Sequence, residues 1–382
     1  MSVRVLNVVS SLFPDGGIES ILLGILRKYD RSRFHHDVCC ITHDDGTASG
    51  EARALGAELL FCRKSVDLAG FSARFRDLVA SRKYDVVHSH VNSWSGVLLR
   101  GAAEAGVPVR IAHLHSASPS LAGRNVGWNP AARLAAAYVD AVGLRWITRH
   151  ATHVLGVSEA ALDLHWPKWR EDPERFHLWA GGVDTDRFKP REGAGAARAP
   201  SLIAVGSFTP DKNQRELVDV LAELRRTSPA AALTLVGTGP CVDDVKGRAR
   251  AAGLGEAVSF PGVRSDVPEL LAGADVFLSA SKREGLPQAV LEAQSCGLPV
   301  VASDIGPHRE AVAPGLQEYL YEPGSPAAAV VRISRLLADE TRRAAAGAAA
   351  RRFVLERFGQ KARLAQLQDW HESWTARGRV RA

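Results

Sequence analysis

The sequence has little cysteine and no long apolar run. Its five cysteines are odd in number and form no C-x-x-C pair, which argues against a disulfide framework and a zinc site and fits a reducing compartment. No apolar stretch is long enough to span a bilayer, and the opening residues "MSVRVLNVVSS" lack the shape of a signal peptide. These absences predict a cytoplasmic protein. The cysteines are Cys39, Cys40, Cys62, Cys241 and Cys296.

The totals are those of a globular protein. With 382 residues the chain is too long for one ordinary hydrophobic core, so two domains are expected. Hydrophobic residues make up 46% and charged residues 24%, which is typical of soluble proteins. The net charge of +6 suits an anionic substrate, and an arginine-rich solvated surface explains it equally well. No nucleic-acid partner is expected.

Near-continuous apolar strands alternate with helical stretches in both halves of the chain. This alternation is typical of a parallel sheet covered by helices on both faces. The expected strands of the first half are 3–12, 36–42, 58–62, 84–90, 109–115 and 151–158, and those of the second half are 201–208, 231–237, 257–262, 274–281 and 299–304.

A Gly/Ala/Pro-rich linker at 191–200 separates the two halves. We therefore predict an α/β fold with two doubly wound, Rossmann-like domains facing across a cleft, since sheets of this type bind ligands beyond the carboxyl ends of their strands. The expected domains are 1–190 and 191–364. The chain ends in a long amphipathic helical region, and its helix at about 365–382 is expected to pack back on the first domain.

The segment "REGLPQAVLEAQSCGLPVVASD" (283–304) carries one glutamate just before a short helix, Glu284, and another within it, Glu292. Pro287 is the expected first helical residue, and Gly297 ends the helix. If all eight intervening steps were helical, the two carboxylates would be separated by a rise of ~12 Å and an angle of ~80°. This arrangement predicts a site for something extended and anionic.

Two loops at strand ends could contact phosphate. Gly16 and Gly17 precede a helix, and paired glycines allow backbone N–H groups to approach an anion, although a simple tight turn explains them equally well. Lys212, in "VGSFTPDKN", could place a charge on a phosphate or be an ordinary surface lysine. In contrast, "LVGTGP" (235–240) lacks the third glycine and the acidic residue of a dinucleotide fingerprint, so a strand-ending turn is favoured.

Four histidines end two predicted strands: His88 and His90 in "HSH", His113 and His115 in "HLH". Alternation points each pair to one face of its strand, with no clear acidic or cysteine partner. A metal site is therefore a minor alternative to polar lining of the cleft and recognition of sugar hydroxyls.

Two other polar segments have simpler explanations or a weaker signal. Asp184 and Asp186 form a D-x-D sequence, which in some nucleotide-sugar enzymes holds a metal, but its position beside the linker favours turn and capping chemistry. The loop "VRSDVPELL" (263–271) ends a strand before a capped helix, and its backbone could line a base pocket.

Taken together, these segments resemble the retaining GT-B glycosyltransferases of family 4 over nearly the whole chain. "EGLPQAVLEAQSCGLPVV" is similar to that family's E-G-[FLM]-[GP]-x4-E-A-x-A-x-G-x-P-V block, and "VGSFTPDKN" resembles V-G-R-[LF]-x3-K-[GN]. "AGGVDTDRF" resembles N-G-[VI]-D-x3-F, "GGIES" the Gly-Gly loop and "ERFGQKARLAQL" the terminal helix. "VHSHVNSWSG" and "RIAHLHS" are similar to the subgroup that acts in polysaccharide and natural-product assembly.

The resemblance implies roles for individual residues. Lys212 would neutralise the donor diphosphate, Glu292 would bind the ribose hydroxyls, and Glu284 would face the transferred sugar. His115 corresponds to the family's active-site histidine, so the implied catalytic residues are Glu284, His115 and Lys212. The diphosphate would need no obligatory metal and no cofactor. The donor-binding set implied by position is Gly16, Gly17, Gly206, Ser207, Lys212, Val263, Arg264, Glu284, Gly285, Leu286, Pro287, Gln288 and Glu292.

Two positions depart from the family pattern. Ser207 replaces the usual arginine after Gly206, which removes a charge-assisted phosphate contact of about 1.5–3 kcal/mol unless Arg264 or Arg283 substitutes. Gly181 replaces the usual asparagine of the N-G-[VI]-D turn, a change that a tight turn tolerates.

The leading hypothesis is a retaining transferase that moves a hexosyl or N-acetylhexosaminyl group from a UDP-linked donor to an acceptor hydroxyl. The alternatives are a GT-B-like epimerase or hydrolase of the nucleotide sugar, and an inactive nucleotide-sugar-binding protein. Incubating the donor without acceptor separates the first alternative, and tight binding without transfer separates the second.

The acceptor is expected to be a small molecule or a lipid-linked glycan precursor. Candidate acceptor residues are His90, His113 and Trp128, whose indole could stack on a sugar or belong to the core. Basic residues flank "VDLAGFSARFRDLVA" (66–80), so this helix could lie peripherally on the inner membrane face. A sheet-covering helix with solvated arginines is favoured over that reading.

Overall fold

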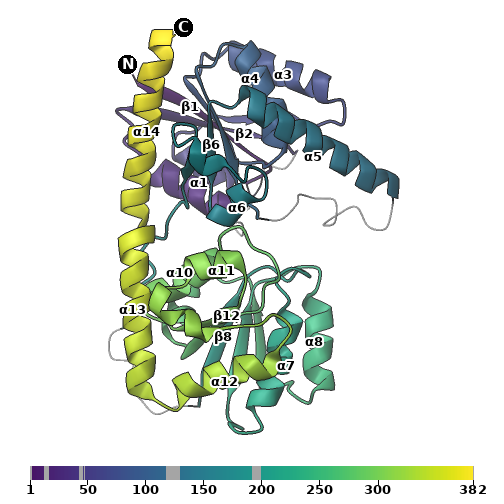
Figure 1. The fold of residues 1–382 in the computed structure, drawn as a ribbon, viewed down its shortest axis with the longest axis vertical. Helices are drawn as coiled ribbons and strands as arrows, with labels where there is room; N and C mark the ends of the chain where they lie inside the picture. The colour runs from purple at the N-terminus through teal and green to yellow at the C-terminus, as the bar shows by residue number, and fades with distance from the viewer. Residues whose placement is uncertain are drawn as a thin grey trace. The chain divides into compact units, whose positions relative to one another are not determined.

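The structure is a computed structural model that describes residues 2–12, 17–42, 46, 48–117, 130–191 and 199–381. The chain divides into two compact units (Figure 1). The first comprises residues 1–182 together with 361–382, and the second comprises residues 183–360. The amino-terminal segment of the first unit thus ends at Gly182, before the linker at 191–200 that was expected to separate the domains.

The first unit is built on a seven-stranded parallel sheet in the order β3-β2-β1-β4-β5-β6-β7. Every strand predicted for this half forms, and the short edge strand β7 was not predicted. The strands are β1 (Val3–Val9), β2 (Phe34–Cys40), β3 (Leu59–Phe61), β4 (Val86–Ser89), β5 (Val109–Leu114), β6 (His153–Gly156) and β7 (Phe176–Leu178). The helices are α1 (Gly17–Lys28), α2 (Ser49–Ala54), α3 (Leu68–Ala80), α4 (Trp94–Glu104), α5 (Pro130–His150), α6 (Glu159–Asp163) and α14 (Gln360–Arg381), with a 3-10 turn at Trp169–Glu171.

Alternation along β1 divides its side chains between two cores, as expected for a central parallel strand. Leu6 and Val8 lie in the core that α3, α4 and α5 cover. Val3 and Val5 lie in the core that α1 and α14 cover on the other face. The apolar runs that predicted the strands are therefore explained by burial on both faces of the sheet.

The apolar face of α3 is used within this unit. Leu68, Phe71, Phe75 and Val79 are all buried in the core. A helix that covers a sheet in this way cannot also present the same face to a membrane, so the structure agrees with the sheet-covering interpretation. In the described part of the chain, no helix has the length and apolar character needed to cross a bilayer.

Helix α14 completes the first unit from the other end of the sequence. The indole N–H of Trp179 donates to the carbonyl of Arg363 at 2.8 Å. Trp374 stacks on His153, with ring centroids 3.8 Å apart. The exposed pair Arg33 and Glu372 adds a charge-assisted contact of 2.8 Å from Nε to Oε1. One face of the sheet thus depends on residues that follow the whole second unit in sequence.

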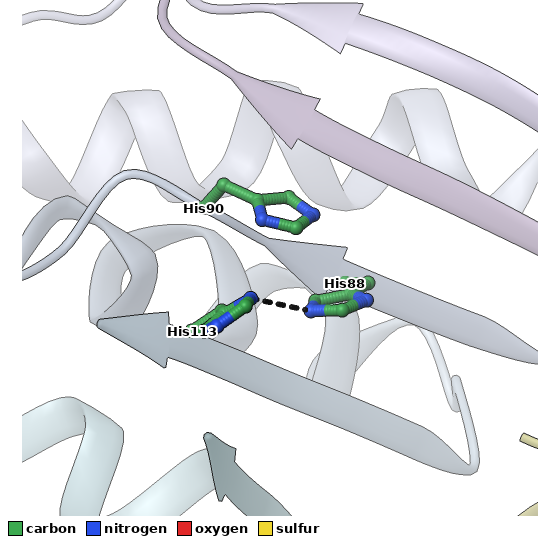
Figure 2. A group of neighbouring side chains, drawn as sticks. All are labelled: His88, His90 and His113. Carbon is green, nitrogen blue, oxygen red and sulfur yellow. Dashed lines mark hydrogen bonds between the residues drawn. The ribbon is translucent and has the colours of Figure 1, made fainter. Parts of the chain in front are cut away.

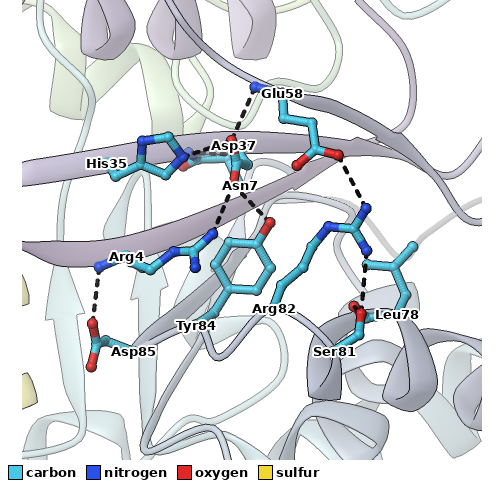
Figure 3. A network of polar contacts seen from close by, with 10 residues as sticks. All are labelled: Arg4, Asn7, His35, Asp37, Glu58, Leu78, Ser81, Arg82, Tyr84 and Asp85. Carbon is cyan, nitrogen blue, oxygen red and sulfur yellow. Dashed lines mark hydrogen bonds and ion pairs between the residues drawn. The ribbon is translucent and has the colours of Figure 1, made fainter.

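A buried carboxylate joins neighbouring strands of the first sheet (Figure 3). Asp37 of β2 accepts hydrogen bonds from the hydroxyl of Tyr84 at 2.8 Å and the backbone N–H of Glu58 at 3.0 Å. His35 lies 3.1 Å and Arg4 3.8 Å from the same carboxylate. Burial and the contact with Asp37 raise the pKa of Tyr84, so its hydroxyl remains a donor. This network explains why a charged residue is tolerated inside a β-strand.

The second unit has a six-stranded parallel sheet in the order β10-β9-β8-β11-β12-β13. All five predicted strands form, and the two-residue edge strand β13 was not predicted. The strands are β8 (Ser201–Val205), β9 (Ala232–Val236), β10 (Val258–Gly262), β11 (Val276–Ser279), β12 (Val300–Ser303) and β13 (Leu320–Tyr321). The helices are α7 (Gln214–Leu224), α8 (Val242–Ala251), α9 (Val267–Ala272), α10 (Gln288–Ser295), α11 (Gly306–Ala311), α12 (Pro326–Leu337) and α13 (Glu340–Phe358), with a 3-10 turn at Pro314–Tyr319.

A close backbone contact fixes α10 against α13. Gly297 follows the end of α10 with a φ of +73°, the left-handed conformation that favours glycine at a helix end. Gly347 of α13 lies so near that a Cβ placed on it would be 2.0 Å from the carbonyl oxygen of Gly297. The helix that carries Glu292 is thus held by a contact that admits no side chain.

Candidate active site

The carboxyl ends of β8 and β11 border a small hollow in the second unit. Its lining includes Lys212, Ser279, Ser281, Glu284 and Pro287. Lys212 comes from the loop after β8, and Ser281 and Glu284 come from the loop after β11. Because all strands of the sheet are parallel, both loops emerge at the same edge, where sheets of this type bind ligands.

Lys212 and Glu284 form an ion pair in this hollow. The ammonium Nζ donates to Glu284 Oε1 at 2.6 Å, and the hydroxyl of Ser281 donates to the same oxygen at 2.7 Å. The Glu284 side chain is 9% exposed and that of Lys212 is 29% exposed. Burial alone would raise the pKa of Glu284, but Lys212 and Ser281 outweigh it and hold the pKa below its usual value. The site thus holds a carboxylate anion and a cation in contact.

A second ion pair lies directly beside the first. Arg283 Nε donates to Asp211 Oδ1 at 2.8 Å, so two consecutive residues of one loop pair with two of the other. Arg264, by contrast, makes a two-pronged contact with Asp266, both distances being 2.7 Å, on an exposed loop. Of the two arginines considered as replacements at Ser207, Arg283 is therefore the one adjacent to the ion pair in the hollow.

Helix α10 begins at Gln288, so the prediction that Pro287 is its first residue was wrong by one position. Pro287 instead precedes the helix with a ψ of 86°, and the N–H of Val290 donates to its carbonyl. Glu292 lies one turn into the helix. Burial raises its pKa to about 7, although Arg187 and a hydrogen bond with Gln288 oppose that rise. The pKa values of the two glutamates are therefore shifted in opposite directions: contact with Lys212 lowers that of Glu284, whereas burial dominates at Glu292.

The remaining predicted donor residues lie on the loops around this sheet edge. Gly206 follows β8, and a Cβ placed on it would be 3.9 Å from Lys212 Cε. Ser207 is exposed, and its carbonyl accepts a hydrogen bond from Gln214. Val263 is 52% exposed on the loop after β10. Gly285 and Leu286 are partly exposed between Glu284 and Pro287.

The glycines of "LVGTGP" have a packing explanation. A Cβ on Gly237 would lie 2.2 Å from the carbonyl oxygen of Gly206, and one on Gly239 would lie 2.5 Å from that of Phe208. The predicted strand-ending turn is therefore present, and its glycines allow it to approach the loop that leads to Lys212.

His88, His90, His113 and His115 form one cluster, and Figure 2 shows its three buried members, His88, His90 and His113. His113 Nε2 lies 3.1 Å from the carbonyl of Trp179, so this nitrogen carries the hydrogen and Nδ1 accepts from His88 Nε2 at 3.3 Å. His90 Nδ1 lies 3.0 Å from His115 Nε2. Burial lowers the pKa of all four rings, that of His90 to about 3, so the cluster is neutral at pH 7.

Burial changes the expected role of two of these residues. His90 and His113 are 1% and 0% exposed, so the direct acceptor contact predicted for them is not available in this structure. Only His115 is partly exposed. His90 instead shares a hydrogen bond with His115, and His113 packs against the same ring with centroids 4.0 Å apart.

The same cluster brings three ring nitrogens of His88, His90 and His113 within 4.8 Å of one another. However, the rings of His88 and His90 are stacked at 25°, with centroids 4.2 Å apart. The planes of these two rings are nearly parallel, so lone pairs that lie in them are poorly placed to converge on one ion. The geometry therefore favours a hydrogen-bonded cluster over a metal site.

Two other predicted features can be placed, and two residues cannot. Asp184 Oδ1 accepts the backbone N–H groups of Asp186 and Arg187, both at 3.3 Å, which confirms turn chemistry for the D-x-D sequence. Gly17 is the first residue of α1. Gly16 and Trp128 lie outside the described residues.

Sequence reasoning missed several polar residues around Glu284, namely Ser279, Ser281, Ser303 and His308. Each belongs to or directly follows a buried strand or lies at the start of α11. The one available signal was the presence of serines and a histidine in otherwise apolar, buried segments.

Known proteins share both the sequence pattern and the fold. A family model described as "Glycosyltransferase Family 4" matches residues 15–187, and one described as "Glycosyl transferases group 1" matches residues 186–353. The chain is 31% identical over 314 residues to "Putative glycosyltransferase EpsF" of Bacillus subtilis, with 79% of each protein covered. It is 33% identical to a GDP-mannose-dependent alpha-(1-6)-phosphatidylinositol monomannoside mannosyltransferase of Mycolicibacterium smegmatis, over 65% of this chain and 67% of that one.

Solved structures agree on the architecture. Anabaena Alr3699/HepE in complex with UDP and glucose matches with a TM-score of 0.79 at 22% identity, covering 97% of this chain and 100% of that one. Sucrose-phosphate synthase from Thermosynechococcus elongatus matches with a TM-score of 0.74 at 19% identity, covering 98% and 99%. These likenesses establish the fold, and the family models and the Bacillus relative establish the family. The chain belongs to the GT-B glycosyltransferases of family 4.

Proposed function

We propose that this glycosyltransferase moves a hexosyl or N-acetylhexosaminyl group, with retention, from a nucleoside-diphosphate sugar to an acceptor hydroxyl. The observation that carries the proposal is the Lys212–Glu284 pair at the carboxyl ends of β8 and β11. A cation and a carboxylate in one largely buried hollow provide opposite charges for the two halves of such a donor. The diphosphate needs a cation, and the sugar needs hydrogen-bond acceptors.

The leaving diphosphate would be stabilised by the ammonium of Lys212 and by the N-terminus of α10, whose dipole favours an anion. Glu284 would then accept hydrogen bonds from the transferred sugar, and Glu292 would bind the ribose hydroxyls. Because a fixed lysine supplies the positive charge, we propose that no metal is obligatory. Arg283 would take the place of the arginine that Ser207 replaces.

In the proposed reaction the acceptor oxygen attacks the anomeric carbon from the face that the phosphate leaves. The C–O bond to the sugar forms as the bond to the phosphate oxygen breaks, and the acceptor's proton passes to that phosphate oxygen. His115, the partly exposed member of the histidine cluster, would contact the sugar or the acceptor, with His90 and His113 in contact with its ring.

We propose UDP as the nucleotide and a glycan precursor or natural product as the acceptor, which would be soluble or lipid-linked. The relatives' names include both GDP-mannose-dependent and UDP-Gal-dependent transferases, so the donor needs a direct test. A thermal-shift screen of nucleoside diphosphates and their sugars provides it, because ligands that bind the native state raise the melting temperature. We expect UDP and one UDP-sugar to give the largest shifts. A larger shift with GDP would assign a guanine nucleotide instead.

Retention is tested on the product. Once a donor and an acceptor react, the proton NMR coupling at the anomeric carbon must match that of the donor sugar. An inverted product would refute the proposed stereochemistry.

One observation favours a second candidate. Ser207 lacks the charge that the family usually supplies, which is what a binding protein without transferase activity could tolerate. That candidate would be supported by tight binding of a UDP-sugar without transfer to any acceptor, and by an affinity for the UDP-sugar that Glu284→Gln leaves unchanged.

A further inference from the structure

His308 lies directly behind the candidate active site. It is 0% exposed and belongs to α11. Its Nδ1 lies 2.6 Å from the carbonyl oxygen of Ser303, and its Nε2 lies 3.2 Å from the hydroxyl of Ser279. Because a carbonyl can only accept, Nδ1 carries the hydrogen. Burial lowers the pKa of His308, so the ring is neutral at pH 7 and its Nε2 accepts from Ser279.

These contacts continue to Glu284. The hydroxyl of Ser303 donates to the carbonyl of Ser281 at 2.6 Å, and the hydroxyl of Ser281 donates to Glu284 Oε1 at 2.7 Å. The hydroxyls of Ser279 and Ser281 are 3.3 Å apart. His308 therefore links Ser279 at the end of β11 to Ser303 at the end of β12. Ser303 in turn contacts Ser281, the serine that donates to Glu284. We call Ser279, Ser281, Ser303 and His308 the His308 network.

The His308 network can hold Glu284 in place when Lys212 cannot. In the described structure Glu284 Oε1 accepts from both Lys212 and Ser281. Under the proposed function, the charge of Lys212 is shared with the diphosphate once the donor binds. Its hold on Glu284 weakens at that moment, while the contact from Ser281 does not depend on the donor.

We propose that His308 is a positioning residue for Glu284, which acts through Ser279, Ser303 and Ser281 to keep the carboxylate in place after the donor binds. This inference rests on the proposed function and adds a residue that the family resemblance did not supply. It predicts an effect on turnover rather than on nucleotide binding, since the network reaches the ion pair by the hydrogen bond from Ser281 to Glu284 and not through Lys212.

The test compares three variants with the wild type. His308→Leu removes the ring contacts with Ser279 and Ser303, His308→Gln restores polar atoms at the same position, and Ser279→Ala removes the contact at Nε2. Ser295→Ala is the matched control, because this buried serine of the same unit donates to the carbonyl of Phe188, which is not part of the His308 network. The readouts are the affinity for UDP and the release of UDP from UDP-glucose, or of GDP from GDP-mannose, with water as acceptor.

We expect His308→Leu to slow turnover roughly tenfold and Ser279→Ala roughly threefold, the kinetic equivalents of losing one or two neutral hydrogen bonds. UDP affinity should stay within about twofold of the wild type, and His308→Gln should recover most of the loss. Ser295→Ala should keep wild-type turnover. If UDP affinity falls in parallel with turnover, or if His308→Leu turns over as the wild type does, the inference is overturned. If His308→Leu does not fold, His308→Gln and Ser279→Ala carry the same comparison.

A crystal structure of His308→Gln or Ser279→Ala with UDP gives an answer that does not need turnover. We expect the Glu284 carboxylate to move away from Ser281 or to become disordered in Ser279→Ala, and to move less in His308→Gln. An unchanged contact between Ser281 and Glu284 in Ser279→Ala would overturn the inference. Failure of the wild type to bind either UDP or GDP would instead overturn the proposed function, so the two failures are distinct.

Discussion

Replacing Lys212 with methionine is expected to destabilise the protein in a way that depends on pH. The substitution keeps most of the apolar stem of Lys212 and removes the charge that faces Glu284 at 2.6 Å. Glu284 is then a 9% exposed carboxylate whose remaining side-chain donor is Ser281. Burial of a charge without its partner costs about 3–5 kcal/mol.

The carboxylate can limit that cost by taking up a proton. A pKa shift of one unit corresponds to about 1.4 kcal/mol, so protonating a group with an ordinary glutamate pKa at pH 7 costs about 4 kcal/mol. At pH 5 the same step costs only about 1 kcal/mol. We therefore expect Lys212→Met to lower the free energy of unfolding by up to ~4 kcal/mol at pH 7 and by ~1 kcal/mol at pH 5.

The sign follows from linkage. In the wild type the pKa of Glu284 is lowered on folding, so its contribution to stability is present above the unfolded pKa and is lost as the pH falls. In Lys212→Met the largest opposition to burial is gone, so we expect a raised pKa for Glu284 and a contribution that is lost as the pH rises.

The assay is urea denaturation of the wild type, Lys212→Met and the double variant Lys212→Met/Glu284→Gln at both pH values. The double variant should recover most of the loss at pH 7, because it buries no unpaired charge. A loss of equal size at both pH values, or a double variant no more stable than Lys212→Met, would refute the reasoning.

Three further outcomes are expected. Burial raises the pKa of Glu292 to about 7, so the wild type loses stability as the pH rises from the unfolded-state pKa of this glutamate to about 7. Glu292→Gln should therefore gain stability relative to the wild type over that range, by up to ~3 kcal/mol in urea denaturation. A pH-independent difference would contradict this. Arg283→Ala should weaken UDP binding in calorimetry by about 1.5–3 kcal/mol if it replaces the missing phosphate ligand, whereas Arg264→Ala should have a much smaller effect; equal losses would reject Arg283 as that ligand. Gly347→Ala should lower stability by about 1–3 kcal/mol, because the added Cβ would lie 2.0 Å from a carbonyl oxygen. Gly247→Ala in α8, whose added Cβ would meet no atom within 4 Å, should be neutral or slightly stabilising in a thermal melt. The same sign for both would show that packing is not the cause.

The fold could be read from the sequence wherever a strand is buried on both faces. β1 and β12, for example, are runs of apolar residues because side chains on each side of the sheet enter a core. β7 and β13 are edge strands of three and two residues and were missed, whereas β3, an edge strand as short as β7, was predicted from the apolar run "ELLFC" around it. The helix end at Gly297 was predicted from local chemistry, whereas the start of α10 was misplaced by one residue because Pro287 fits both positions.

The site was only partly predictable, for a different reason. Strand-end loops of a parallel sheet gather at one edge, so Lys212 and Glu284 were expected in the same region without knowledge of their direct contact. Alternation placed the histidines of each "H-x-H" pair on one face, but it could not show that His90 and His113 are buried. His308 was missed because its link to Glu284 passes through serines of two segments far apart in sequence, Ser279 and Ser281 at the end of β11 and Ser303 at the end of β12, and no local pattern encodes such a path.

The position of α14 has a consequence for how the chain is made. Its residues Leu364, Leu367 and Trp374 cover the face of the first sheet formed by Val3 and Val5, yet the ribosome produces them only after the entire second unit. Until α14 is synthesised, this face of the amino-terminal sheet therefore lacks part of its apolar cover. Chains with exposed apolar surface are prone to aggregate at this stage. The second unit, whose segments are continuous in sequence, has no such delay and can finish folding before the unit that precedes it.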